Sequence, residues 1–356
     1  MKKIVSIVGT RPEYIQLGAI LPYLRQVASH KIVNTGQHYD FAMARAFFDQ
    51  LKLKCDYDLK VGSLSHGAQV GAMLAGCEKV LVREGPDAVA VFGDTNSTLA
   101  GALAAAKLNI PVVHIEAGMR SYDRRMPEEV NRIIVDHIAD LLLCVSKTGV
   151  RNLNAEGIAE NVFMTGDIKL DLLKKVEPDF SILKKLRIAP RGYYLLTLHR
   201  VENIENLARL KRIFGVISKI DKPVIWPIHP RVRNFYIRSQ NSEDYQSSII
   251  TISPVNYSEM IGLEKKSLAI ITDSGGVQKE AYWLRIPCFT LRNSTEYPET
   301  VKSGWNKLAG DKLELLPKLV GTFKVPQKHP NFYGDGKAGF IIAQKIRDYL
   351  KNYRSA

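Results

Sequence analysis

The chain has few cysteines and no long apolar run, and both shortages narrow what it can do. Its four cysteines stand far apart at positions 55, 77, 144 and 288, and no Cys-x-x-Cys pair occurs. This spacing favours neither a disulfide framework nor a structural zinc site, so we expect reduced thiols and a cytoplasmic protein. No window of about 18 apolar residues occurs, so we expect no membrane span. Arg11 interrupts the apolar run at the N-terminus, which argues against a secretion signal.

Nucleic-acid-binding motifs are also absent, although the chain is basic. Lys and Arg number 50 against 36 Asp and Glu, which gives a net charge of +14. Such a surplus attracts anionic small molecules and nucleic acids alike. Because the basic residues are dispersed along the chain, we expect an anionic small molecule as partner and no nucleic acid.

The rest of the composition is that of an ordinary globular protein of about two domains. Hydrophobic residues make up 46% of the 356 and charged residues 24%, and a domain takes ~150 residues. Apolar β-type runs alternate with helical patterns, which predicts doubly wound α/β domains with parallel sheets. We expect an N-terminal domain over residues 1–168, a Lys-rich linker stretch leading into a second domain over 169–337, and a last helix, 338–356, that packs back on the first domain. The expected strands are 3–8, 31–34, 88–92, 112–115, 141–145 and 162–164, then 193–198, 224–228, 248–252, 268–272 and 287–291.

Two turns carry most of the functional information. Gly-Asp-Thr-Asn-Ser at 93–97 and Asp-Ser-Gly-Gly at 273–276 each follow an apolar strand and precede a helix. Ligands of open parallel sheets bind at such turns, where helix N-terminal amides favour anionic groups. The pair predicts one anionic ligand held between two domains. In the second turn the amides of Ser274, Gly275 and Gly276 suit a phosphate, and Glu280 on the same helix suits two ribose hydroxyls.

Charged residues follow other predicted strands of the first half. Arg11, in Gly-Thr-Arg-Pro-Glu at 9–13, suits a phosphate, although the segment also reads as a structural turn. Asp94 follows a buried strand, where it also reads as a helix N-cap. Glu116 leaves an apolar strand at the edge where ligands bind. Glu128 begins a helix, a place that the helix dipole explains without any function.

Two histidines follow strands of the second half. His199 comes after the strand at 193–198, and His229 comes after the strand at 224–228. A single histidine is more often structural than catalytic, but two at equivalent strand ends favour a shared site.

Together these segments resemble the non-hydrolysing UDP-N-acetylglucosamine 2-epimerases, from residue 3 to about residue 310. The resemblance implies two Rossmann-like domains facing a cleft, as in type B glycosyltransferases, with a UDP-sugar in the cleft. It also implies a homodimer and neither a metal nor a nicotinamide cofactor. The matching segments are 9–13, 37–38, 93–95, 114–121, 127–132, 199–203, 229–230, 273–276 with 280, and 295–299.

The family reaction inverts C2 of the sugar by loss of UDP across C1 and C2 and re-addition of UDP to a glucal intermediate. It needs carboxylates that move protons and cations that stabilise the departing diphosphate. The resemblance assigns the acid/base work to three carboxylates and the diphosphate to two cationic side chains, without assigning each carboxylate to a face of the sugar. The implied catalytic residues are Asp94, Glu116, Glu128, His199 and Arg11, and the implied substrate-binding residues are Gln16, His229, Ser274, Gly275, Gly276 and Glu280.

Two departures from the family pattern stand out. Gln16 occupies a position where many members have lysine, so a cation is missing; its loss would slow UDP departure or mark a different sugar. Tyr39, Asp40 and Ala68 replace the pattern of members that are activated by their own substrate, so we expect no such activation.

Three functions besides UDP-N-acetylglucosamine epimerisation stay open. Segments 120–127 and 278–282 look like those of archaeal members and of epimerases acting on UDP-2,3-diacetamido-uronates, whose extra carboxylate would need a further cation. A glycosyltransferase of similar fold is another alternative, which is disfavoured because such an enzyme has no need for three such carboxylates. A catalytically weak UDP-sugar-binding protein is suggested by Gln16 alone.

Overall fold

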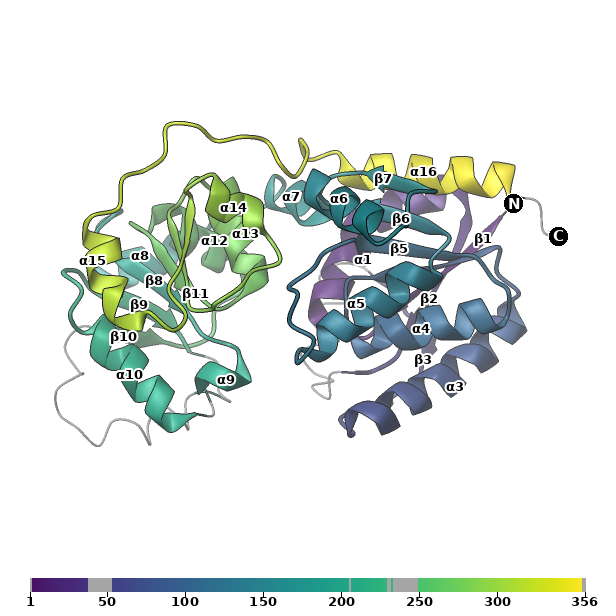
Figure 1. Cartoon of the computed structure of the whole chain (residues 1–356), viewed down its shortest axis with the longest axis horizontal. Helices are drawn as coiled ribbons and strands as arrows, with labels where there is room; N and C mark the ends of the chain where they lie inside the picture. The colour runs from purple at the N-terminus through teal and green to yellow at the C-terminus, as the bar shows by residue number, and fades with distance from the viewer. Residues whose placement is uncertain (1, 38–52, 205, 229–231, 233–248, 354–356) are drawn as a thin grey trace. The chain divides into compact units, whose positions relative to one another are not determined.

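The computed structural model of the chain describes residues 2–37, 53–204, 206–228, 232 and 249–353 (Figure 1). The chain divides into two compact units. Unit 1 comprises Met1–Lys174 and Asn331–Ala356, and unit 2 comprises Lys175–Pro330. In the described part of the chain, no helix has both the length and the apolar character needed to cross a membrane.

Unit 1 is built on a parallel sheet whose described strands run in the order β3-β2-β1-β4-β5-β6-β7. The central position of β1 and β4 follows from their composition, because continuous apolar runs suit strands that are covered on both faces. The strands are β1 Lys3–Val8, β2 Ser29–Asn34, β3 Tyr57–Asp58, β4 Ala88–Phe92, β5 Val112–Ala117, β6 Leu141–Cys144 and β7 Val162–Met164. The helices are α1 Arg11–Val27, α3 His66–Glu84, α4 Asn96–Lys107, α5 Pro127–Ile138, α6 Lys147–Ala155, α7 Ile168–Leu173 and α16 Ala338–Asn352.

Alternate residues of β4 face two different cores. Ala88, Ala90 and Phe92 pack in the cluster that contains α1 and α16 residues, whereas Val89 and Val91 pack in the cluster that contains α3 and α4 residues. All five are fully buried. Helices therefore cover both faces of this sheet, as the doubly wound prediction requires.

The C-terminal helix α16 packs on α1, and Figure 1 shows α16 along unit 1. Its first amides are held by the buried carboxylate of Asp171 in α7, which accepts from the Ala338 N–H at 3.0 Å and the Gly339 N–H at 2.8 Å. This capping satisfies two of the backbone donors that a helix N-terminus leaves unpaired.

Unit 2 repeats the design with a parallel sheet whose described strands run in the order β10-β9-β8-β11-β12-β13. Two apolar clusters cover its faces. The strands are β8 Tyr194–Thr197, β9 Val224–Pro227, β10 Ile249–Ile252, β11 Ile270–Thr272, β12 Cys288–Thr290 and β13 Asn306–Leu308. The helices are α8 Ser181–Leu186, α9 Val201–Ile204, α10 Leu207–Ile217, α12 Tyr257–Lys266, α13 Gly275–Trp283, α14 Pro298–Lys302, the 3-10 helix η2 Leu313–Leu315 and α15 Leu316–Gly321.

The Lys-rich stretch after Asp167 differs from the expected linker, because it contains the two short helices α7 and α8. Asp167 caps α7 by accepting from the Lys169 N–H at 2.8 Å. The apolar side chains of Ile168, Leu170 and Leu173 are buried beneath it. A cap followed by spaced apolar residues therefore outweighs the polar composition of the stretch.

Candidate functional site

The turn after β1 is held by a buried carboxylate. Glu13 is 2% exposed and accepts from the backbone N–H groups of Gly9 at 2.7 Å and Thr10 at 2.8 Å. Its other oxygen accepts from the hydroxyls of Thr95 at 2.5 Å and Thr98 at 3.1 Å, which belong to the turn and helix after β4. Burial raises the pKa of Glu13, and these hydrogen bonds oppose that rise. Glu13 therefore fastens two strand-end turns together.

Close packing explains the glycine of this turn. A Cβ atom on Gly9 would lie 2.0 Å from the Thr35 hydroxyl and 2.1 Å from the Ser97 hydroxyl, so no larger residue fits. Arg11 follows as the first residue of α1 and is exposed to solvent.

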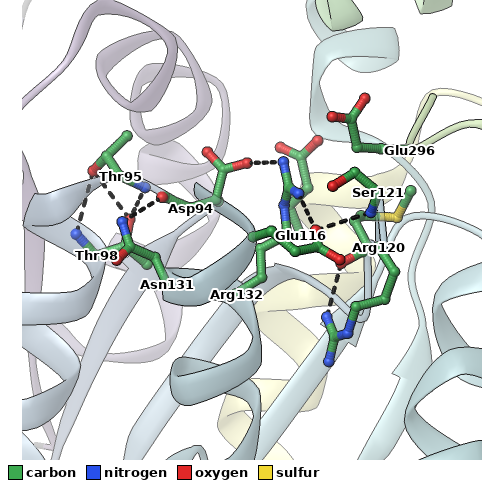
Figure 2. A network of polar contacts seen from close by, with 12 residues as sticks. Asp94, Thr95, Thr98, Glu116, Arg120, Ser121, Asn131, Arg132 and Glu296 are labelled. Carbon is green, nitrogen blue, oxygen red and sulfur yellow. Dashed lines mark hydrogen bonds and ion pairs between the residues drawn. The ribbon is translucent and has the colours of Figure 1, made fainter. Parts of the chain in front are cut away.

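Asp94 is not the N-cap residue of α4. Thr95 is the N-cap of α4 and accepts from the Thr98 N–H at 3.3 Å. The Asp94 side chain, 31% exposed, instead pairs with the Arg132 guanidinium, as Figure 2 shows. Asn131 supports the same turn by donating to the Asp94 carbonyl at 2.9 Å.

Arg132 links Asp94 to a second carboxylate that is buried. Its other terminal nitrogen donates to Glu129 at 2.5 Å, and Glu129 is 1% exposed. Glu129 also accepts from the N–H groups of Ser121 at 2.9 Å and Tyr122 at 2.7 Å. Arg132 therefore joins the turn after β4 to the loop after β5.

Glu128, the neighbouring acid, has a different environment. It is half-buried in the first turn of α5, and none of the hydrogen bonds or ion pairs found among the described residues involves it. Of the two acids at this helix start, Glu129 is the one that supports the fold.

Glu116 lies in a strained segment near the end of β5. Its φ of 73° is in the left-handed region that favours glycine, and the pairing of β5 with β6 shifts register between Ile115 and Ala117. A bulge of this kind re-aims one side chain of a strand, and strained non-glycine residues cluster at functional sites. The Glu116 carboxylate accepts from the Gln16 amide and from Lys169 Nζ, the latter at 3.3 Å.

A buried ionic cluster supports the loop that follows Glu116. Asp136 accepts from His114 Nδ1 at 2.7 Å and from Arg120 Nη1 at 2.6 Å, and Arg120 also reaches Glu156 at 2.7 Å. Burial alone would raise the pKa of Asp136, but the charges and hydrogen bonds of His114 and Arg120 hold it below its ordinary value. His114 and Arg120 both lie in the matching segment 114–121. In the structure they bind Asp136 and stabilise the loop.

Asp273 organises the corresponding turn of unit 2. It is fully buried and accepts from the backbone N–H groups of His199 at 3.0 Å and Arg200 at 3.1 Å. It also accepts from the Asn203 side chain at 2.9 Å. The carboxylate therefore fixes the turn after β8, at which the His199 side chain is exposed.

The helix α13 begins directly after Asp273. Ser274 is its N-cap residue, and Gly275 and Gly276 form its first turn, which is half-buried. Glu280 lies farther along α13, where it accepts from the Tyr257 hydroxyl at 2.9 Å. A glycine-rich helix start beside a half-buried carboxylate suits a phosphate next to a ribose.

A buried ion pair lies just after β12 in unit 2. Arg292 donates through two nitrogens to the two oxygens of Glu296, both at 2.9 Å, and Arg200 approaches Glu296 at 3.9 Å. Both side chains of the bidentate pair are 4% exposed. This pair positions the segment 295–299 that was singled out from the sequence.

Several predicted residues therefore come together within one unit. Asp94 and Glu116 lie at the ends of the neighbouring strands β4 and β5, and Gln16 contacts Glu116. In unit 2, Asp273 brings His199 close to the start of α13, because it accepts from the His199 N–H and directly precedes the N-cap residue Ser274. His229 lies outside the described residues. Lys169, Glu129, Arg132 and Asp273 are not among the predicted site residues, although the last three lie in the segments that match the family pattern.

Comparisons with known proteins agree with this geometry. A family model described as UDP-N-acetylglucosamine 2-epimerase matches residues 24–347. A Methanococcus maripaludis protein named UDP-N-acetylglucosamine 2-epimerase homolog is 44% identical over 355 residues, covering 97% of this chain and 99% of that protein. The UDP-2,3-diacetamido-2,3-dideoxy-D-glucuronate 2-epimerase of Pseudomonas aeruginosa is 39% identical over 359 residues, covering 97% of this chain and 99% of that protein.

A solved structure is similar over nearly the whole chain. It is that of Methanocaldococcus jannaschii UDP-GlcNAc 2-epimerase in complex with UDP-GlcNAc and UDP, with a TM-score of 0.85 and 42% identity. The match covers 97% of this chain and 99% of that one. The predicted fold class, two Rossmann-like domains of the type B glycosyltransferase kind, is confirmed. The chain therefore belongs to the UDP-N-acetylglucosamine 2-epimerase family.

Proposed function

We propose that this chain interconverts UDP-N-acetylglucosamine and UDP-N-acetylmannosamine by elimination and re-addition of UDP. One observation carries the proposal beyond family membership: Asp94 and Glu116 leave adjacent parallel strands at the same sheet edge, and each is paired with a cation. Two carboxylates held in this way suit proton transfer to and from a bound sugar.

In the proposed reaction the C2–H and C1–O bonds break, and a C1–C2 double bond forms. A carboxylate takes the C2 proton, and UDP leaves with the C1–O electron pair. UDP then adds back at C1 while C2 receives a proton on its other face. Asp94, Glu116 and Glu128 supply the acid and base groups, while Arg11 and His199 stabilise the departing diphosphate. Both bonds re-form without a change in oxidation state, so the scheme needs neither a nicotinamide nor a metal cofactor.

Unit 2 binds the nucleotide in this proposal. The amides at the start of α13, from Ser274 to Gly276, hold phosphate oxygens, since a helix N-terminus favours anions. Glu280 accepts from the two ribose hydroxyls. His229 completes the proposed set of substrate-binding residues. We further propose that the enzyme is cytoplasmic and forms a homodimer. Light scattering of the purified protein would test the dimer through its mass.

The second candidate substrate is a UDP-2,3-diacetamido-uronate. The relative of Pseudomonas aeruginosa that is named for such a substrate is 39% identical over nearly its full length. The same elimination applies to this sugar, whose added carboxylate would require a further cationic side chain near the pocket.

Incubation in heavy water followed by proton NMR tests the proposal. With UDP-N-acetylglucosamine we expect loss of the C2 proton signal by deuterium exchange and a new anomeric signal of the manno product. Exchange with the diacetamido-uronate substrate alone would select the second candidate. Saturable UDP-sugar binding without exchange on either substrate would show a binding protein and contradict both.

A further inference from the structure

The environment of Glu116 contains a cation that the sequence did not lead us to expect. The Gln16 side-chain amide from α1 and the Lys169 ammonium from α7 donate to the same oxygen, Oε2, of Glu116. Gln16 is 3% exposed, and the side chains of Lys169 and Glu116 are 21% and 10% exposed. A lysine is missing at position 16, but an ammonium group lies 3.3 Å from the carboxylate nonetheless.

Packing of α7 on α1 brings the two donors together. Asp167 caps α7, and Ile168 enters the same apolar cluster as α1 residues. Gln16, Glu116 and Ile168 also line one narrow crevice in unit 1. The position of Lys169 is therefore fixed by the packing of α7 on α1.

We propose that Lys169 is a positioning residue that supplies, from α7, the positive charge expected at position 16. It rests on the proposed function, because its effect is exerted through Glu116 as one of the acid/base groups. An ammonium beside a half-buried carboxylate interacts more strongly than in bulk water. It holds the Glu116 carboxylate in one orientation, and the amide of Gln16 adds a second, uncharged donor to the same oxygen. The charge near Glu116 is relocated and not lost.

Kinetics of four variants test this assignment. We expect Lys169→Gln to lower kcat by ~10²-fold, the scale for losing one electrostatic group at a reacting centre, while KM and UDP affinity change little. Lys169→Arg should keep most of the turnover because it keeps the charge. Gln16→Lys alone should leave turnover unchanged or lower it, because a second cation would crowd one carboxylate.

The decisive variant is the exchange, Gln16→Lys with Lys169→Gln, which moves the charge from α7 to α1. Its turnover should be at least tenfold higher than that of Lys169→Gln. Lys147→Gln, which removes an exposed lysine at the start of α6, serves as the control and should behave as the parent.

The outcomes separate this proposal from the proposed function. An active parent with an equally active Lys169→Gln variant, or an exchange variant no better than Lys169→Gln, would overturn the role of Lys169 alone. A parent that binds UDP but exchanges no C2 proton would overturn the proposed function and this assignment with it. A gain in turnover from Gln16→Lys alone would show that the charge at position 16 was missing and not replaced.

Discussion

Replacing Arg132 with methionine separates the structural work of this residue from its work at the proposed active site. Arg132 bridges Asp94, which is 31% exposed, and Glu129, which is 1% exposed. Removing the guanidinium leaves the Glu129 charge buried without its cation, a change that costs about 3–5 kcal/mol in buried ion pairs. Since the Ser121 and Tyr122 amides still bind Glu129, we expect the lower end, about 3 kcal/mol.

The double variant Arg132→Met with Glu129→Gln removes both charges. The glutamine oxygen can accept from only one of the two amides, because the Ser121 and Tyr122 N–H groups bind different oxygens of Glu129. It should recover part of the lost free energy of unfolding, because no buried charge remains, and stay about 1–2 kcal/mol below the parent, because one amide has lost its acceptor. Turnover should stay at least ~10²-fold below the parent in both variants, because Asp94 has lost its cation in both.

Urea unfolding followed by circular dichroism gives the stabilities, and steady-state kinetics give turnover. Arg125→Met is the matched control, because the side chain of Arg125 is 91% exposed and its pair with Asp123 lies on the surface. The control should leave both quantities unchanged. If the double variant regained turnover together with stability, Arg132 would act only through the fold. If Arg132→Met were as stable as the parent, the buried charge argument would be wrong.

The other predictions concern the carboxylates and the nucleotide. Asp94→Asn, Glu116→Gln and Glu128→Gln should each lower turnover by ~10² or more and leave UDP affinity within a few fold; near-normal turnover in all three would contradict the mechanism. Glu280→Ala should weaken UDP binding by about 1.5–3 kcal/mol in calorimetry, and unchanged affinity would move the ribose site elsewhere. Because folding lowers the pKa of Asp136, its stabilisation is complete above about pH 4 and is lost as pH falls through the lower folded value. Between pH 5 and pH 3, the free energy of unfolding should therefore fall more for the parent than for Asp136→Asn, as measured by urea unfolding at each pH. Equal losses would refute the lowered pKa of Asp136.

The strands were the easiest part of this fold to predict from sequence. β1 and β4 are continuous apolar runs bounded by polar turns, and the structure has them at the expected residues. β3, Tyr57–Asp58, is too short to show any periodicity. The helix α7 was missed because lysines dominate its surroundings, although Asp167 followed by spaced apolar residues was the available signal.

The candidate site was predictable where residues follow strands and not where they reach in from elsewhere. Asp94 and Glu116 were selected because each leaves a buried strand. Arg132 and Glu129 are charged residues in the first turns of a helix, and only the packing of α5 brings them to Asp94. Lys169 is 53 residues from Glu116 in sequence, so no local pattern could connect them.

The central claim is that UDP leaves the sugar during the reaction, and a positional isotope exchange tests it most directly. UDP-N-acetylglucosamine is prepared with ¹⁸O in the oxygen that bridges C1 and the β-phosphorus, and phosphorus NMR follows the label during turnover. We predict that the label moves into the non-bridging β-phosphate positions, because the bond between C1 and oxygen breaks and UDP rotates before it adds back. Epimerisation with the label still wholly in the bridge would contradict the elimination mechanism.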